Sequence, residues 1–63
     1  MGKAYYTFRV VLEDDYYLTD EVNTDQPSIE EALRYAITRW EAEDKLRVDK
    51  RGESLTIRIY RKN

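Results

Sequence analysis

The chain has 63 residues, which allows one small domain near the lower size limit for folding without cross-links. It contains no cysteine and no histidine, which excludes disulfides, thiolate metal sites, thiol nucleophiles and imidazole bases. Hydrophobic residues make up 41% and charged residues 38% of the chain, and six residues are tyrosine. This balance is typical of a folded domain rather than a disordered one.

The net charge of −2 is unevenly distributed. Residues 1–24 carry two basic and five acidic side chains, residues 25–45 carry three and six, and residues 46–63 carry six and two. The basic last segment is expected to attract the acidic remainder of its own fold, with an acidic partner or nucleic acid as alternatives. The longest apolar run has three residues and no signal-peptide pattern is present, so we expect a cytoplasmic protein without a membrane span.

Residues 3–12 and 16–23 are predicted to form a β-hairpin, because apolar and polar side chains alternate along both runs. Acidic residues 13–15 supply the turn. We favour an odd loop length, since a loop of two residues would turn a polar strand face toward the core. The three-residue loop sets Leu12 opposite Tyr16, and a five-residue loop keeps the same parity.

Asp20 has the most unusual predicted position among the carboxylates. In the three-residue register it faces inward, opposite Phe8. Because buried polar groups need hydrogen-bond partners, we expect Asp20 to lie near the sheet edge, bonded to the backbone or solvated. A catalytic role for this carboxylate is the disfavoured alternative, because general-base chemistry would need a perturbed group in a cleft that so short a chain has little room to form.

The other chemistry-bearing patterns are also weak, and we expect no enzyme activity, cofactor or metal. The acidic groups at residues 13–15 and 41–44 lack the spaced ligands and the central glycine of a calcium loop. The only glycines are Gly2 and Gly52, so no glycine-rich phosphate loop exists.

A helix is predicted over residues 29–43. Ser28 and Glu31 fit a capping box, and Pro27 discourages an earlier start. Six apolar residues share an arc of roughly 140° on the helix surface: Ile29, Ala32, Leu33, Ala36, Ile37 and Trp40. No glycine marks the end, but continued winding would turn acidic side chains toward the apolar arc, so the helix should unwind around residues 42–45.

Residues 46–49 and 54–61 predict a second hairpin, with an even loop from Lys50 to Glu53 around Gly52. Two hairpins joined by a helix predict an α+β fold of the ββαββ type, with one helix packed on one face of a four-stranded mixed sheet. The predicted strand order is 2-1-4-3. The first and last strands, which are the most apolar, become parallel neighbours at the centre.

The length, the element order and the C-terminal sequence resemble the immunoglobulin-binding domains of protein L and, more loosely, of protein G, which are small β-grasp domains. The matching residues are Leu46-Arg47-Val48-Asp49, the turn at Gly52 and Leu55-Thr56-Ile57-Arg58-Ile59. The first turn lacks that family's Asn-Gly type of signal, and Arg34, Thr38 and Arg39 replace its small polar residues and tyrosines on the helix. The resemblance therefore implies the fold and little about antibody binding.

The sheet face turned away from the helix is the predicted interaction surface, because tyrosine and arginine are enriched at protein interfaces. Its candidate residues are Tyr5, Arg9, Val11, Tyr17, Arg47, Arg58 and Tyr60. These residue types also suit an exposed strand face that only pairs across the sheet.

Binding of a protein partner, including self-association, is the favoured function, through this face or through an exposed edge strand. An alternative is a nucleic-acid-binding domain that stacks single-stranded bases on the same tyrosines and arginines, which the overall acidity disfavours. A further alternative is a designed folding scaffold without biological function.

Overall fold

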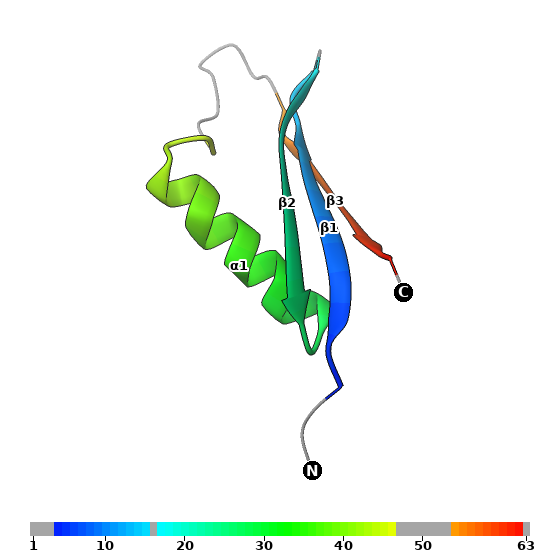
Figure 1. The fold of residues 1–63 in the computed structure, drawn as a ribbon. Coiled ribbons are helices and arrows are strands. Elements are labelled where there is room, and N and C mark those ends of the chain that lie inside the picture. Colours follow the sequence, from blue (N-terminus) through cyan, green and yellow to red (C-terminus); the bar gives the residue numbers. More distant parts are fainter. Residues whose placement is uncertain (1–3, 16, 47–53, 63) are drawn as a thin grey trace.

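A computed structural model describes residues 4–15, 17–46 and 54–62. The elements in chain order are β1 (Tyr6–Glu13), β2 (Leu18–Gln26), α1 (Ile29–Ala42) and β3 (Thr56–Arg61). Within the described residues, the three strands form one antiparallel sheet in the order β2-β1-β3, and α1 packs on β2 and β1 (Figure 1). The chain is therefore α+β, as predicted.

The predicted four-stranded mixed sheet of order 2-1-4-3 is wrong. β3 pairs with β1 in the antiparallel direction, whereas the prediction made the first and last strands parallel. The helix α1 carries the chain back along the sheet, so that β3 enters parallel to β2 with β1 between them (Figure 1). Leu46 lies outside any strand, and residues 47–53, including the predicted even loop, lie outside the described residues.

The three-residue first loop is also wrong. Leu12 pairs with Asp20 instead of Tyr16, and Val10 pairs with Val22, so the apolar faces match as the odd parity requires. The last pair is Glu13 with Leu18, however, which leaves the four residues 14–17 between the strands, so the preference for an odd loop is wrong. A bulge follows Leu12, where the register shifts by one residue. The predicted register set Asp20 opposite Phe8, which is buried, so that a carboxylate would have been desolvated there. In the observed register Asp20 lies opposite Leu12, and the apolar Val22, at 2% exposure, lies opposite Val10.

The helix α1 turns only part of its predicted apolar arc into the core. Ala32, Ala36 and Trp40 are fully buried, Leu33 and Ile37 are half-buried, and Ile29 is exposed. The two small alanines allow α1 to approach the sheet closely, and Trp40 fills the space at the end of the helix. The complete buried cluster is Phe8, Val10, Leu12, Val22, Ala32, Ala36 and Trp40.

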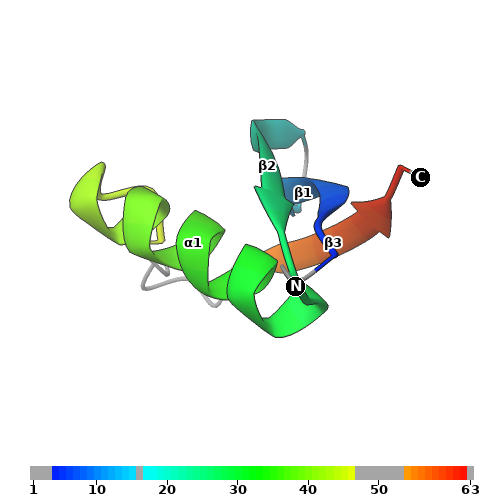
Figure 2. The same cartoon turned by 60° about the horizontal axis from the view of Figure 1, so that its bottom comes forward.

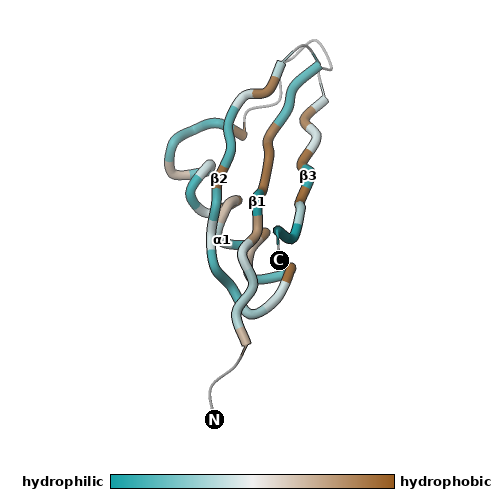
Figure 3. The backbone as a smooth tube through the Cα atoms, turned by 45° about the vertical axis from the view of Figure 1, so that its right-hand side comes forward, coloured by the Kyte–Doolittle hydropathy of each residue, from teal (hydrophilic) through white to brown (hydrophobic). Residues whose placement is uncertain are grey.

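The strand β3 receives less cover than its neighbours. In Figure 2, α1 lies toward β2, and β3 lies at the other side of the sheet. Brown apolar and teal polar residues alternate along β3 in Figure 3. Its apolar residues Ile57 and Ile59, with Leu55 just before the strand, pack against the core cluster but stay half-buried.

The start of α1 confirms the predicted cap. The helix begins at Ile29, and the Glu31 N–H donates to Ser28 Oγ at 3.2 Å. The Ser28 backbone is extended, as an N-cap requires, so the capping residue supplies an acceptor for an amide that has no partner inside the helix.

The end of α1 is a Schellman motif without glycine. The Asp44 N–H donates to the Glu41 carbonyl at 3.1 Å, and the Lys45 N–H donates to the Trp40 carbonyl at 2.8 Å. Asp44 takes the left-handed position, with φ of 58°. The helix therefore ends at Ala42, one residue before the predicted end, and the chain turns sharply at Asp44.

We expect Asp44→Gly to raise the free energy of unfolding by about 0.5–1 kcal/mol, because the left-handed conformation costs an L-residue energy that glycine avoids. Urea unfolding followed by far-ultraviolet circular dichroism measures the change. Asp44→Asn is the control, because asparagine tolerates the same backbone conformation without the charge. A glycine variant less stable than wild type would contradict the prediction.

Candidate functional site

The open face of the sheet, which points away from α1, is covered by side chains that pair with one another. Arg9 Nε lies 3.0 Å from Glu21 Oε1, and Arg58 Nε lies 3.0 Å from Glu13 Oε1. The guanidinium carbon of Arg9 also lies 5.5 Å from the centre of the Tyr60 ring. Each contact joins neighbouring strands, so both of these candidate arginines already have an acidic partner.

The structure brings only part of the predicted interaction surface together. Val11 lies at the centre of the open face but is 3% exposed, between the rows of paired side chains. Tyr5, at 60% exposure, precedes β1, and Tyr17, at 72% exposure, lies at the opposite end of that strand in the loop before β2. Arg47 lies outside the described residues. The remaining candidates, Arg9, Arg58 and Tyr60, are neighbours.

Asp20 joins β2 to the end of α1. Its Oδ2 accepts hydrogen bonds from Trp40 Nε1 and from Lys45 Nζ, each at 2.9 Å, and its Oδ1 accepts from the Glu21 N–H at 2.8 Å. The bond from Lys45, then that from the Glu21 amide, lowers the pKa of Asp20. The bond to Asp20, followed by that to Glu43, raises the pKa of Lys45. Asp20 is thus a bonded structural carboxylate.

The partners of Asp20 were missed in the sequence, although one signal pointed to them. The indole N–H of Trp40 sits at the end of the apolar arc of α1, and a buried indole N–H needs an acceptor. Asp20 was the carboxylate expected to face inward. It needed hydrogen-bond donors and the Trp40 indole needed an acceptor, so the two residues could have been paired from the sequence.

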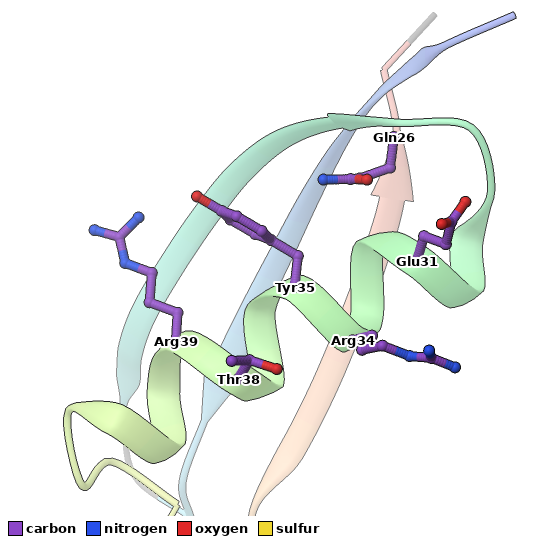
Figure 4. Close-up of a pocket in the computed structure, with 6 residues that line it drawn as sticks. All are labelled: Gln26, Glu31, Arg34, Tyr35, Thr38 and Arg39. Carbon is purple, nitrogen blue, oxygen red and sulfur yellow. The ribbon is translucent and has the colours of Figure 1, made fainter. Parts of the chain in front are cut away.

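A shallow groove of about 510 Å³ lies between the end of β2 and α1 (Figure 4). Its lining residues are Gln26, Glu31, Arg34, Tyr35, Thr38 and Arg39. Gln26 Nε2 donates to Thr24 Oγ1 at 2.9 Å, and Arg39 pairs with Glu43 at 3.4 Å. In Figure 4, Tyr35 and Gln26 lie on one side of the helix and Arg34 points away from them. The groove holds no paired nucleophile and base, so its geometry does not indicate catalysis.

No described residue pairs with the outer edge of β3. The Lys62 N–H donates to the Thr7 carbonyl at 2.8 Å and continues the register between β3 and β1. Antiparallel strands alternate between residues bonded to the neighbouring strand and residues directed away from it. Counting back from Lys62, the N–H and C=O groups of Ile57 and Ile59 therefore point outward, toward the open edge.

The helix leaves an apolar strip on its own flank beside the inner face of β3. Leu33 and Ile37 are half-buried and line a hollow of about 370 Å³ on α1. They lie on the opposite flank of the buried stripe from Tyr35, which faces the end of β2 (Figure 4). The Leu33 flank therefore faces the β3 side of the sheet, where Ile57 and Ile59 are also half-buried.

The outer edge of β2 differs from that of β3. The backbone of Thr7 points toward β3, so by alternation that of Val10 points toward β2 and its partner Val22. The next residue on β2, Glu21, therefore directs its N–H outward. That donor is already satisfied by Asp20 Oδ1. Glu21 and Asp25 add negative charge along the strand, and charged side chains discourage pairing at an edge. Of the two outer edges, β3 is the one better suited to accept another strand.

No family model, curated protein or solved structure matches the chain. The resemblance to the protein L domains therefore stays a prediction from the sequence. In residues 4–15, 17–46 and 54–62, no helix has the length and apolarity needed to cross a membrane. The same residues contain no group of three or more acidic side chains placed to bind a metal ion.

We expect Asp20→Asn to lower the free energy of unfolding by about 1–3 kcal/mol, because the charge-assisted bond to Lys45 is lost at a partly buried site. Asp25→Asn is the matched control, because Asp25 accepts a bond from Thr7 on the exposed face. Its cost should be about 0.5 kcal/mol or less. Urea unfolding followed by Trp40 fluorescence measures both, and equal losses would contradict the role given to Asp20.

The lowered pKa of Asp20 predicts that wild type and Asp20→Asn differ in how their stability depends on pH. The pKa of Asp20 is lower in the folded state, so the unfolded state binds more protons at acid pH. The stabilisation by Asp20 should be complete above the ordinary aspartate pKa of about 4 and disappear as the pH falls through the folded-state pKa. Wild type should therefore lose more stability than Asp20→Asn on acidification, as measured by urea midpoints across the acid range. Parallel curves would contradict this.

Proposed function

We propose that the chain is a small non-enzymatic protein-binding domain that accepts an extended segment of a partner as an added strand at the outer edge of β3. The observation that supports the proposal most directly concerns two residues of β3. The backbone groups of Ile57 and Ile59 point outward, and their side chains lie on an inner face that α1 covers only in part. An added strand there satisfies hydrogen bonds and buries apolar surface together.

The open face supports this choice over nucleic-acid binding. Phosphate binding relies on basic side chains that can replace counterions. Arg9 and Arg58 are instead paired with Glu21 and Glu13. Both ion pairs reduce the positive charge that either arginine offers to a phosphate. The outward backbone groups of β3 do not depend on these charges.

The size of the edge sets the expected affinity. β3 has six residues, and an added strand of similar length buries a small interface. Interfaces of this class are transient, so we expect a Kd of roughly 1 µM to 1 mM. The interaction would therefore be reversible and easily displaced.

Selection of random displayed peptides of about ten residues on the purified domain tests the proposal. We expect enriched peptides to slow hydrogen exchange at the Ile57 and Ile59 amides, which point to the edge. Each peptide should lose binding when the backbone is N-methylated on one set of alternate residues and keep it when the other set is methylated, because alternate amides of a strand face opposite edges. Equal effects of the two methylation patterns would contradict strand addition.

Ile57→Lys should abolish selection, because it places an inward-pointing charge at the edge. Thr56→Lys is the matched control, with the same new charge on the open face one residue earlier. Circular dichroism establishes that both variants fold. Selection unaffected by Ile57→Lys would place the binding elsewhere, and a domain that enriches no peptide would favour the scaffold alternative.

A further inference from the structure

We infer that the segment accepted by β3 is an acidic one in which aliphatic residues alternate with aspartate or glutamate. This inference rests on the strand addition proposed above and names the chemistry of the partner. The juxtaposition that carries it is a basic row on the open side of β3 and an apolar strip on its inner side.

The charged side chains of residues 54–62 are all basic, and acidic side chains that bond to this segment, Glu13 and Asp15, come from β1 and the loop after it. Residues 54–62 contain the basic side chains Arg58, Arg61 and Lys62 and no acidic side chain. Arg58 and Lys62 alternate with the inward-facing isoleucines, so they share the open side of the sheet. The Arg58 side chain is 57% exposed. It bonds to Glu13 through Nε and also has Tyr60 as a partner, which still leaves guanidinium N–H donors for a further carboxylate.

The inner side of the same edge is apolar along most of β3. Leu55, Ile57 and Ile59 are half-buried there, and Arg61 at the end of the strand lies over the Tyr6 ring. On α1, Leu33 and Ile37 are also half-buried. In an added antiparallel strand, residues directly opposite Ile57 and Ile59 point to this inner side, and the residues between them point to the open side beside Arg58. An added strand with apolar residues on its inner side and acidic residues on its open side therefore matches both sides of β3 in one register.

A second copy of the chain matches the edge less well. If two β3 strands paired with each other, Arg58, Arg61 and Lys62 of both copies would lie along one seam, and like charges opposed across strands are destabilising. The acidic β2 edge of a second copy has two polar residues, Asp20 and Thr24, on either side of the buried Val22 on its inner side, where β3 has isoleucines. Its Glu21 N–H is also already bonded. The complementary occupant is therefore a different chain.

Three blocked peptides of about seven residues test the inference: valine alternating with glutamate, with glutamine and with lysine. Titration into labelled domain, followed by the Ile57 and Ile59 amide resonances, should rank the affinities as glutamate, then glutamine, then lysine. We expect the glutamate peptide to bind at least about threefold more tightly than the glutamine peptide. Raising the salt from about 50 mM to about 500 mM should remove most of that difference.

Arg58→Gln should reduce the preference for the glutamate peptide by about threefold, whereas Arg39→Gln should leave it unchanged. Arg39 is the matched control because it is an exposed arginine paired with Glu43 on the other flank of α1. Equal, salt-independent binding of the glutamate and glutamine peptides at Ile57 and Ile59 would overturn the acidic preference and leave strand addition in place. If none of the peptides binds at Ile57 and Ile59, both strand addition and the acidic preference are wrong. If the domain forms concentration-dependent dimers that perturb the same amides, the occupant of the edge is a second copy of the chain and not a separate partner.

Discussion

The carboxylate of Asp20 determines how the helix sits on the sheet. It accepts hydrogen bonds from the Trp40 indole and the Lys45 ammonium, and these two residues lie at the end of α1. A carboxylate on the inner side of a strand is unfavourable unless such donors reach it. Both donors come from one helix end and the acceptor comes from the edge strand β2, so the contact draws the end of α1 toward β2 and away from β3.

The way the helix ends makes this contact possible. The left-handed backbone of Asp44 turns the chain directly after α1, and the Lys45 amide bonds back to the Trp40 carbonyl. Lys45 therefore lies beside Trp40, and both side chains reach the same carboxylate. The half-covered apolar face of β3 is the counterpart of this arrangement, because one helix of 14 residues cannot cover three strands evenly once its end is held over β2.

Local features of the fold could be predicted from the sequence. Ser28, Glu31 and the apolar arc of α1 act within one turn or along one face, and the parity of the first hairpin follows from alternation alone. The exact register could not, because parity leaves registers two residues apart equally compatible with the pattern. The choice between them depends on Asp20 meeting Trp40, a contact between residues far apart in the chain. The strand direction also failed, because the prediction placed two strands after the helix, whereas β3 is the one described strand after α1 and runs antiparallel to β1.

The sequence shows which residue types the candidate surface contains. It does not show whether their side chains are free to contact a partner. Arginine, tyrosine and valine on one strand face are visible in the sequence. That Arg9 and Arg58 are already paired, and that Val11 is covered, depends on which acidic residues lie opposite on neighbouring strands. That no described residue pairs with the outer edge of β3 was harder to foresee, because it follows from the sheet topology.

The pairing of β3 with β1 also determines the order in which the domain is completed during synthesis. The β1–β2 hairpin and α1 involve neighbouring parts of the chain and can form as soon as residues 6–42 have emerged from the ribosome. An isolated pair of strands is only marginally stable, and the β1 edge stays open until residues 56–61 arrive. The nascent chain therefore passes through a stage in which its most apolar strand has one uncovered edge, and a strand from another nascent chain could occupy the place later taken by β3.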